Sequence, residues 1–367
     1  MHRGKRRTNQ RRRGSAAICA MLAAIVAMGG CSDATSDADA AIGDGAVGDA
    51  ALGDSVGADA AADVDALSRT EALRMNQIQV VGTHNSYHKR PKTGGPKDWQ
   101  YDHLPLDAQA ATQGVRQFEL DLYYNAALKR FEVRHVGVFD AETTCFTFAD
   151  CLTALRTFSD AHPQHVPLWV WLEPKEADDT MIDGNLLATV EAEIDAIWPA
   201  NRRISPDDIR GDAVDLRSAV AAKGWPLLNT VRGKAIFTLL ESGKVRDAYV
   251  AADPALKGRV LFAEGGKDTA WGVTAKIDDP ISGAQAIGEA VLAGQLIRTR
   301  ADATDEPWAG DTSRREAAFA SGAQACSTDF PAEVAEPAGY SVRLPGLVVA
   351  RCNPVNAPPG CPPGELE

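Results

Sequence analysis

The feature that most restricts the fold of this 367-residue chain is a repeated alternation of short apolar runs with longer amphipathic segments. The apolar runs that we expect to be strands lie near residues 77–83, 116–123, 167–173, 235–241, 259–264, 272–278, 295–300 and 323–328. Amphipathic segments at residues 186–198 and 284–293 are typical of the intervening helices. Such alternation predicts a parallel sheet, and these eight units favour a single TIM-type (β/α)8 barrel, which need not be regular. An open, doubly wound α/β sheet is the alternative, and the fifth and sixth strands look joined by a loop instead of a helix.

The N-terminal segment has the pattern of an export signal. Residues 1–13 carry seven basic side chains and no acidic one, and an apolar run follows at residues 16–28. This run is too short for a membrane span, and the sequence then reads Met28-Gly29-Gly30-Cys31-Ser32, similar to a bacterial lipobox. We therefore expect residues 1–31 to form a lipoprotein-type signal that ends at a lipidated Cys31. The protein would be anchored to the bacterial cell envelope, or secreted if cleavage occurs elsewhere.

Residues 32–71 are rich in Ala, Gly and Asp, with nine Asp and no Lys or Arg among residues 32–68. So little apolar bulk cannot offset the entropy of ordering, and we expect a disordered tether. From Arg69 onward the chain has 31 basic and 41 acidic residues, without a basic stripe, so nucleic acid is not an expected partner. We expect residues 72–367 to form one catalytic domain with a Cys- and Pro-rich tail, and we expect the protein to be a monomer. No continuous apolar segment of this domain stands out as one that enters a lipid bilayer.

Five cysteines would remain in the exported, oxidising environment. Cys145 and Cys151 bracket a short loop, and Cys352 and Cys361 bracket a Pro-rich one, so each pair is expected to form a disulfide. Cys326 lies in an apolar run and is expected to be a buried thiol.

Carboxylates mark the carboxyl ends of two predicted strands, where barrel enzymes place their chemistry. Period-two alternation sets Glu119 and Asp121 on one face of the second strand, with apolar residues on the other face. Glu173 ends the third strand in the same way. Neighbouring carboxylates are costly unless they share a cation or a proton, and together with Asn85 they offer only oxygen ligands. This donor set selects Ca²⁺ or Mg²⁺ over zinc.

Histidines and basic residues complete the candidate site. His84 follows the first strand directly, whereas His135 falls among apolar positions, where a histidine by itself more often belongs to the core. Lys175 lies one pleat beyond Glu173, and Arg300 could bind a phosphate or form a salt bridge with Asp302.

Taken together, these motifs resemble the bacterial Ca²⁺-dependent phosphatidylinositol-specific phospholipases C over roughly residues 74–353. The resemblance is carried by Gly82-Thr83-His84-Asn85-Ser86-Tyr87-His88, Glu119-Leu120-Asp121, His135 and Trp171-Leu172-Glu173-Pro174-Lys175. It implies a PLC-like phosphodiesterase barrel whose Ca²⁺ is held by Asn85, Glu119, Asp121 and Glu173. The partner would be a phospholipid at a membrane surface.

The resemblance also implies a mechanism, in which the inositol 2-hydroxyl attacks phosphorus. The products would be diacylglycerol and inositol 1,2-cyclic phosphate, or inositol phosphate after further hydrolysis. His84 would take the phosphate-stabilising or base role and His135 the acid role, although the sequence leaves open which is which. Lys175 and Arg300 would hold phosphate or inositol oxygens.

Two other functions stay open. One is another barrel phosphodiesterase, such as a glycerophosphodiester phosphodiesterase, although those enzymes typically have Arg where this chain has Asn85. The other is a surface lipoprotein that binds inositol lipids without turnover.

Overall fold

Eight parallel strands form a closed ring. They are β1 (Ile78–Thr83), β2 (Gln117–Asn125), β4 (Leu168–Pro174), β6 (Ala235–Leu239), β7 (Phe262–Ala263), β8 (Thr274–Lys276), β9 (Leu296–Arg300) and β10 (Ala325–Thr328). Each pairs in parallel with the next in this order, and β10 pairs with β1. The step from β7 to β8 is a single parallel bridge between Glu264 and Thr274. The predicted TIM-type barrel is therefore confirmed, irregular at this step, and the open-sheet alternative is wrong.

The computed structural model describes residues 72–137, 139–175, 183–361 and 366–367. The predicted export signal and tether, including Cys31, lie outside these residues. Within them no helix is both long and apolar enough to cross a membrane.

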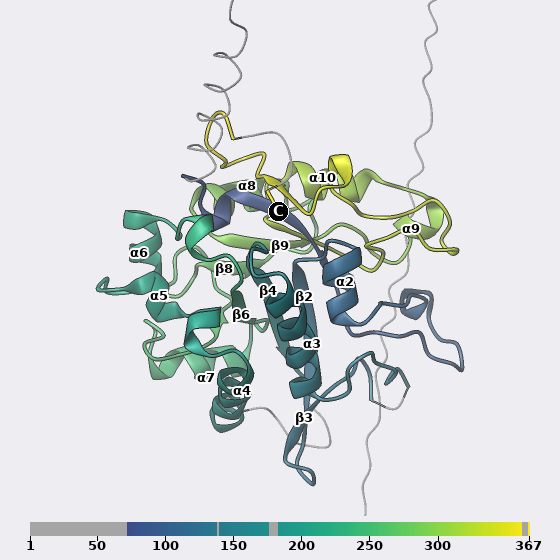
Figure 1. Cartoon of the computed structure of the whole chain (residues 1–367), viewed down its shortest axis with the longest axis horizontal. Coiled ribbons are helices and arrows are strands. Elements are labelled where there is room, and N and C mark those ends of the chain that lie inside the picture. Colours follow the sequence, from purple (N-terminus) through teal and green to yellow (C-terminus); the bar gives the residue numbers. More distant parts are fainter. Residues whose placement is uncertain (1–71, 138, 176–182, 362–365) are drawn as a thin grey trace, which may run out of the picture. The chain divides into compact units, whose positions relative to one another are not determined.

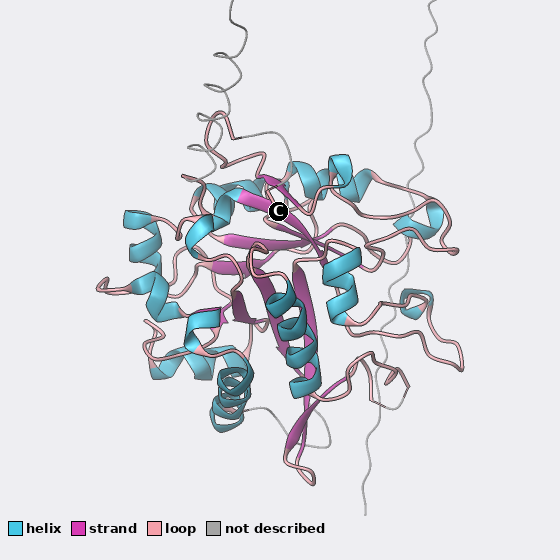
Figure 2. Cartoon of the chain, viewed as in Figure 1, coloured by secondary structure: helices cyan, strands magenta, loops and turns pink. Residues whose placement is uncertain are grey.

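Helices surround the strands (Figures 1 and 2). They are α2 (Leu106–Thr112), α3 (Phe148–Ala161), α4 (Gly184–Ile197), α5 (Pro206–Arg210), α6 (Leu216–Lys223), α7 (Lys244–Ala252), α8 (Ala284–Leu292), α9 (Glu306–Ala309) and α10 (Ser313–Ala320). Local capping fixes where some begin: the Thr147 hydroxyl accepts from the Asp150 amide at the start of α3, and the Asp183 carboxylate caps α4. A loop joins β7 to β8, as predicted.

Three shorter strands extend the sheet beyond the ring. β3 (Arg130–Val133) pairs antiparallel with β2, and β11 (Ala350–Cys352) pairs antiparallel with β1. β5 (Arg203–Ile204) lies beside the first residues of β6. The long β2–β3 hairpin projects from the ring (Figure 1).

The two faces of β2 show how the sequence pattern builds the site. Phe118, Leu120 and Leu122 belong to the large apolar core, which includes residues of α3 and α4. Glu119 and Asp121 occupy the alternate positions and are buried. Glu119 contacts Arg298 of β9, which is 179 residues away in the chain, so these side chains point into the ring. The predicted inward face of carboxylates is thus the one that forms.

Both predicted disulfides are present. Cys145–Cys151 closes the loop before α3, and Cys352–Cys361 closes the loop after β11. Cys326 is a buried free thiol, as expected.

Candidate active site

The turn after β1 brings backbone and side chains close to β2. A Cβ at Gly82 would lie 2.0 Å from Gln117 Oε1, so this position needs glycine. Asn85 has a φ of 42°, a left-handed conformation that asparagine tolerates better than most residues. The Ser86 hydroxyl accepts from the Glu119 amide at 2.8 Å, and the Ser86 amide donates to the Glu119 carbonyl. These contacts hold His84 and Asn85 beside Glu119 of β2.

Glu119, Asp121 and Glu173 form a carboxylate cluster. One carboxylate oxygen from each of the three lies within 4.8 Å of the other two. The register explains this, because Asp121 of β2 and Glu173 of β4 are direct partners across the parallel ladder. Asn85 lies close to this cluster through Tyr87. The Tyr87 hydroxyl donates to Asn85 Oδ1 at 3.5 Å, and burial together with the nearby charge of Asp121 raises the pKa of Tyr87.

The electrostatics of this cluster fit a bound cation. Both carboxylate oxygens of Asp121 are buried without a hydrogen-bond donor. Lys175 Nζ lies 3.3 Å from Asp121 Oδ2 and donates to Glu173. Burial raises the pKa of Asp121 well above its usual value, with Lys175 opposing and the Glu173 charge adding to the effect. A hard divalent cation would satisfy these orphaned oxygens, and the all-oxygen donor set matches Ca²⁺.

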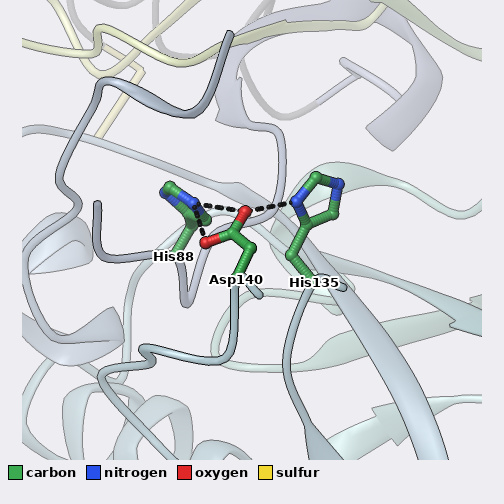
Figure 3. Close-up of side chains that lie close together, drawn as sticks. All are labelled: His88, His135 and Asp140. Atoms are coloured by element: carbon green, nitrogen blue, oxygen red, sulfur yellow. Dashed lines mark hydrogen bonds and ion pairs between the residues drawn. The ribbon is translucent and has the colours of Figure 1, made fainter. Parts of the chain in front are cut away.

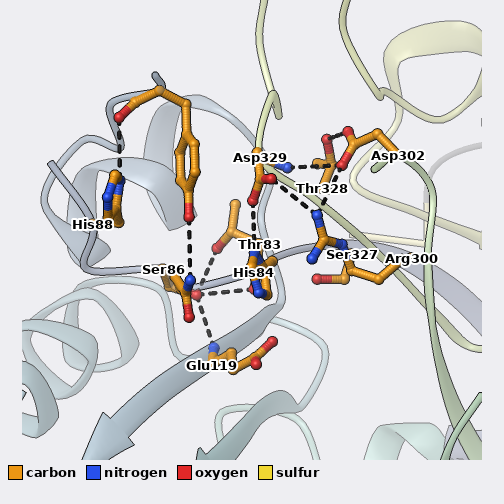
Figure 4. A network of polar contacts seen from close by, with 12 residues as sticks. Thr83, His84, Ser86, His88, Glu119, Arg300, Asp302, Ser327, Thr328 and Asp329 are labelled. Atoms are coloured by element: carbon orange, nitrogen blue, oxygen red, sulfur yellow. Dashed lines mark hydrogen bonds and ion pairs between the residues drawn. The ribbon is translucent and has the colours of Figure 1, made fainter. Parts of the chain in front are cut away.

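A second network surrounds His84, at the ends of β9 and β10 (Figure 4). His84 Nδ1 lies 2.9 Å from Asp329 Oδ1, and Arg300 donates to the other oxygen of Asp329 at 2.9 Å. Asp302 accepts from Thr328 and from the Asp329 amide. Burial lowers the pKa of His84, and the Arg300 charge lowers it further, against the opposing charges of Asp329 and Glu119. This shift favours the neutral imidazole of His84, whose Nδ1 is fixed by the Asp329 carboxylate.

The charges on the two aspartates of this network differ. Burial would raise the pKa of Asp329, but Arg300 and His84 outweigh it and hold that pKa well below the usual range. Burial and the neighbouring Asp329 charge raise the pKa of Asp302 to about 7. One proton is thus easily kept on Asp302 next to an ionised Asp329.

His135 is held by a third carboxylate (Figure 3). His135 Nδ1 lies 2.6 Å from Asp140 Oδ2, and His88 Nε2 lies 3.0 Å from both oxygens of Asp140. His88 Nδ1 faces the Tyr101 carbonyl at 3.2 Å, so both ring nitrogens of this fully buried histidine face acceptors. Burial would raise the pKa of Asp140, but the hydrogen bonds of His135 and His88 outweigh it and lower that pKa.

One pocket collects the reactive groups. It has a volume of about 260 Å³ and is lined by His84, Asn85, His135, Arg300 and Asp329, together with Asp98, Trp99, Asp278, Asp302, Ala303, Thr304 and Arg314. Because an aspartate binds Nδ1 of each pocket histidine, the opposite nitrogen, Nε2, is the one available for proton transfer. The pocket therefore presents two oriented imidazoles beside a guanidinium and next to the carboxylate cluster.

The structure brings together the residues singled out in the sequence. The roles of Lys175 and Arg300 in holding substrate oxygens stay predictions. Lys175 pairs with two of the predicted metal ligands, and Arg300 pairs with Asp329 as well as with Asp302, 3.5 Å away. Arg300 still lines the pocket, so the salt bridge and a role in phosphate binding are compatible.

Sequence reasoning missed the residues that orient the histidines. Asp140 was not considered, although it follows His135 by five residues. The sequence analysis assigned no role to Asp329, yet this residue follows β10 directly, and the carboxyl ends of strands are where the other site residues lie. Arg298, which binds Glu119, lies within a strand rather than at its end.

Comparisons with known proteins agree with this geometry. Residues 73–131 and 124–354 match the family model described as Ca²⁺-dependent phosphoinositide phospholipase C. No curated protein sequence matches the chain.

Solved structures of two bacterial enzymes share the fold. A calcium-dependent phosphoinositol-specific phospholipase C from a Pseudomonas species, in a myo-inositol complex, aligns with a TM-score of 0.52 and 17% identity, covering 71% of this chain and 91% of that one. A Ca²⁺-dependent phosphatidylinositol-specific phospholipase C from Streptomyces antibioticus aligns with a TM-score of 0.53 and 20% identity, covering 71% and 96%. At these identities the structures establish the barrel alone.

Proposed function

The chain belongs to the Ca²⁺-dependent phosphoinositide phospholipase C family, and on this premise we propose that it cleaves phosphatidylinositol to diacylglycerol and inositol 1,2-cyclic phosphate. The observation that carries the proposal is the pocket in which His84 and His135 are each held at Nδ1 by an aspartate, next to three converging carboxylates. This arrangement supplies a base, an acid and a cation site for one phosphodiester.

Asn85, Glu119, Asp121 and Glu173 would hold Ca²⁺. When bound there, the ion would neutralise charge on the phosphate and acidify the inositol 2-hydroxyl. Arg300 would stay on Asp329 while presenting its guanidinium to the pocket, where it can donate to a phosphate oxygen. Lys175 would leave the carboxylates when the cation enters and donate to substrate oxygens.

The two histidines divide into base and acid. Burial and the Arg300 charge lower the pKa of His84, which favours the neutral imidazole, so its Nε2 can accept the proton of the inositol 2-hydroxyl. Asp140 fixes Nδ1 of His135 at 2.6 Å, which leaves Nε2 of this second pocket imidazole for the leaving oxygen. We therefore assign proton donation to the leaving glyceride oxygen to His135 Nε2.

The test is product release from phosphatidylinositol in mixed micelles, followed by phosphorus NMR with added Ca²⁺ and with EDTA. We expect a cyclic inositol phosphate signal that depends on Ca²⁺. Absence of the cyclic product, or equal rates with EDTA, would remove this function. Preference for water-soluble glycerophosphoinositol over the lipid would instead favour a glycerophosphodiester phosphodiesterase.

We also propose that the enzyme is exported and anchored through an acyl chain on Cys31. Two disulfides support an oxidising compartment. Incorporation of labelled palmitate into the parent chain, and its loss in Cys31→Ser, tests the anchor. Equal labelling of both would contradict it.

A further inference from the structure

We propose that His88, His135 and Asp140 form a second metal site, selective for Zn²⁺, and that an ion bound there switches off proton donation by His135. This inference rests on the proposed function, because it concerns the histidine to which that function assigns the leaving-group proton. The three residues share no member with the carboxylate cluster that would hold Ca²⁺.

The ligand atoms of these three side chains converge (Figure 3). One atom from each lies within 4.8 Å of the other two. His88 Nε2 lies 3.0 Å from both oxygens of Asp140, and His135 Nδ1 lies 2.6 Å from Asp140 Oδ2. A tetrahedral zinc ion at about 2.0–2.1 Å from its ligands holds those ligand atoms about 3.3 Å apart. The nitrogen–oxygen distances therefore need to widen by less than about 1 Å for the ion to enter.

His88 has the orientation of a metal ligand. Its Nδ1 faces the Tyr101 carbonyl at 3.2 Å, and its Nε2 faces the Asp140 carboxylate. A neutral imidazole has one N–H, which Nδ1 needs for the carbonyl, so Nε2 is left with a lone pair that points at a fully buried carboxylate. Two buried acceptors that face each other repel, and a cation between them removes the repulsion. A backbone carbonyl at the opposite nitrogen is also a usual partner of a metal-binding histidine.

The backbone holds these ligands close together. His88 forms an antiparallel β-bridge with Thr143, which lies on the same loop as Asp140. Val136 and Asp140 exchange two backbone hydrogen bonds of 3.0 and 2.9 Å, which close the turn that links His135 to Asp140. The His135 side chain is 22% exposed and lines the pocket, so an ion can reach the site from solvent. The site is thus built in advance and accessible.

The donor set separates this site from the carboxylate cluster. Two imidazole nitrogens and one carboxylate are a ligand set typical of zinc, and they leave one position of a tetrahedral ion for water. Ca²⁺ takes about 6–8 oxygen ligands, which this site does not supply. The two ions should therefore bind the protein at different places and at the same time.

An ion on Nδ1 changes what His135 can donate. Without the ion, an imidazolium at His135 can give its Nε2 proton to the leaving oxygen while Nδ1 stays bound to Asp140. With the ion on Nδ1, the ring carries a single proton, on Nε2, and its loss would leave an imidazolate. A neutral imidazole is a far weaker acid than an imidazolium, so the proton donor is lost although the ring stays in the pocket. We therefore expect Zn²⁺ to lower kcat with little effect on KM.

The first experiment measures Zn²⁺ binding by calorimetry in excess Ca²⁺, which fills the carboxylate cluster. All proteins are untagged full chains carrying Cys19→Ser and Cys31→Ser, so that no N-terminal thiol binds zinc. The test variant is His88→Gln, which keeps a donor for Asp140 but removes a nitrogen ligand. The matched control is His162→Ala, which removes an exposed histidine at the end of α3. Thermal melting shows that each variant is folded.

We expect the parent and His162→Ala to bind one Zn²⁺ per chain with equal affinity. His88→Gln should bind zinc about tenfold or more weakly, because loss of a ligand costs at least as much as loss of a group that orients one. His135→Ala, which changes a residue on the pocket wall, should show the same loss and keeps the test valid if His88→Gln does not fold. With Co²⁺ in place of Zn²⁺, the strong visible absorption of a four-coordinate ion should appear in the parent and be absent from both variants. Equal zinc affinity in the parent and the folded variants would overturn the site.

The second experiment measures turnover of phosphatidylinositol in excess Ca²⁺ as Zn²⁺ is added. The kcat of the parent should fall over the range of zinc concentrations in which calorimetry shows binding, whereas the activity that remains in His88→Gln should not respond there. Bound zinc with unchanged kcat would overturn the switch. Inhibition that added Ca²⁺ relieves would place the ion in the carboxylate cluster and would also overturn it.

The two proposals fail separately. If the parent cleaves no phosphatidylinositol in Ca²⁺ without zinc, the proposed function fails. Calorimetry and the cobalt absorption involve no substrate, so they still decide whether His88, His135 and Asp140 bind a metal ion.

Discussion

His84 and His135 are both held at Nδ1 by an aspartate, but the two aspartates belong to different networks. Asp329 lies 245 residues from His84 along the chain and also accepts a hydrogen bond from the Arg300 guanidinium. A second carboxylate, that of Asp302, lies beside it. Asp140 lies five residues from His135 and shares its charge with another imidazole, that of His88. The first network joins the turn after β1 to the ends of β9 and β10. The second joins His88, on the loop after β1, to the loop after β3 that carries both His135 and Asp140. The Arg300 charge on Asp329 weakens the support that this carboxylate gives to an imidazolium at His84, which suits a base.

Loss of either pocket histidine should have the largest effect. His135→Ala is expected to lower kcat on phosphatidylinositol by about 10²–10⁴-fold, because the leaving oxygen loses its proton donor. Ca²⁺ binding, measured by calorimetry, should be largely retained. His162→Ala, which removes an exposed histidine at the end of α3, is the control and should be as active as the parent. Parental activity in His135→Ala would rule out the assigned acid.

The two aspartates should then differ in whether their loss moves the acidic limb of the pH profile. We expect Asp329→Asn and Asp140→Asn each to lower kcat by about 10–100-fold, since a positioning carboxylate is lost. Asp329→Asn should move the acidic limb to lower pH, because the base becomes easier to deprotonate. Asp140→Asn should leave the acidic limb in place, because Asp140 does not contact the base. A shift of the acidic limb in Asp140→Asn would contradict the division of roles.

Asp302 should make the metal-free protein less stable as the pH rises. Its pKa is raised to about 7, so between its ordinary pKa and this value the folded state holds a proton that the unfolded state has released. The stabilising contribution of protonated Asp302 to the free energy of unfolding is therefore fully present at low pH and is lost as the pH rises through about 7. In urea denaturation, Asp302→Asn should gain roughly 1–3 kcal/mol relative to the parent between about pH 4 and about pH 8. A difference between the two proteins that does not change with pH would contradict the assignment.

The smallest kinetic effect is expected at His88, which binds Asp140 and packs edge-on against His135, with ring centroids 5.9 Å apart. His88→Gln retains a donor and should lower kcat only severalfold, while His88→Ala should also cost about 1–3 kcal/mol of stability by leaving a buried carboxylate oxygen unpaired. The two variants are compared by kcat and by denaturant unfolding. A larger kinetic loss in His88→Gln than in Asp140→Asn would show that His88 acts directly instead of through Asp140.

Much of the fold could be read from the sequence because parallel strands buried on both sides leave unmistakable apolar runs. All eight ring strands formed where they were expected, and the alternation in β2 placed Glu119 and Asp121 inside. Periodicity also located the candidate ligands, because the carboxyl ends of parallel strands meet at one edge.

Residue type and local period were sufficient to determine the barrel, the oxygen-rich cluster, both disulfide pairs and the family. They depend on the pattern within a strand or a short loop, which the chain encodes locally. Only the tertiary structure decided which carboxylate orients which histidine and that Lys175 lies among the predicted metal ligands. Those contacts depend on how loops from different strands converge at the mouth of the barrel. The spacing of residues along the chain does not predict this convergence.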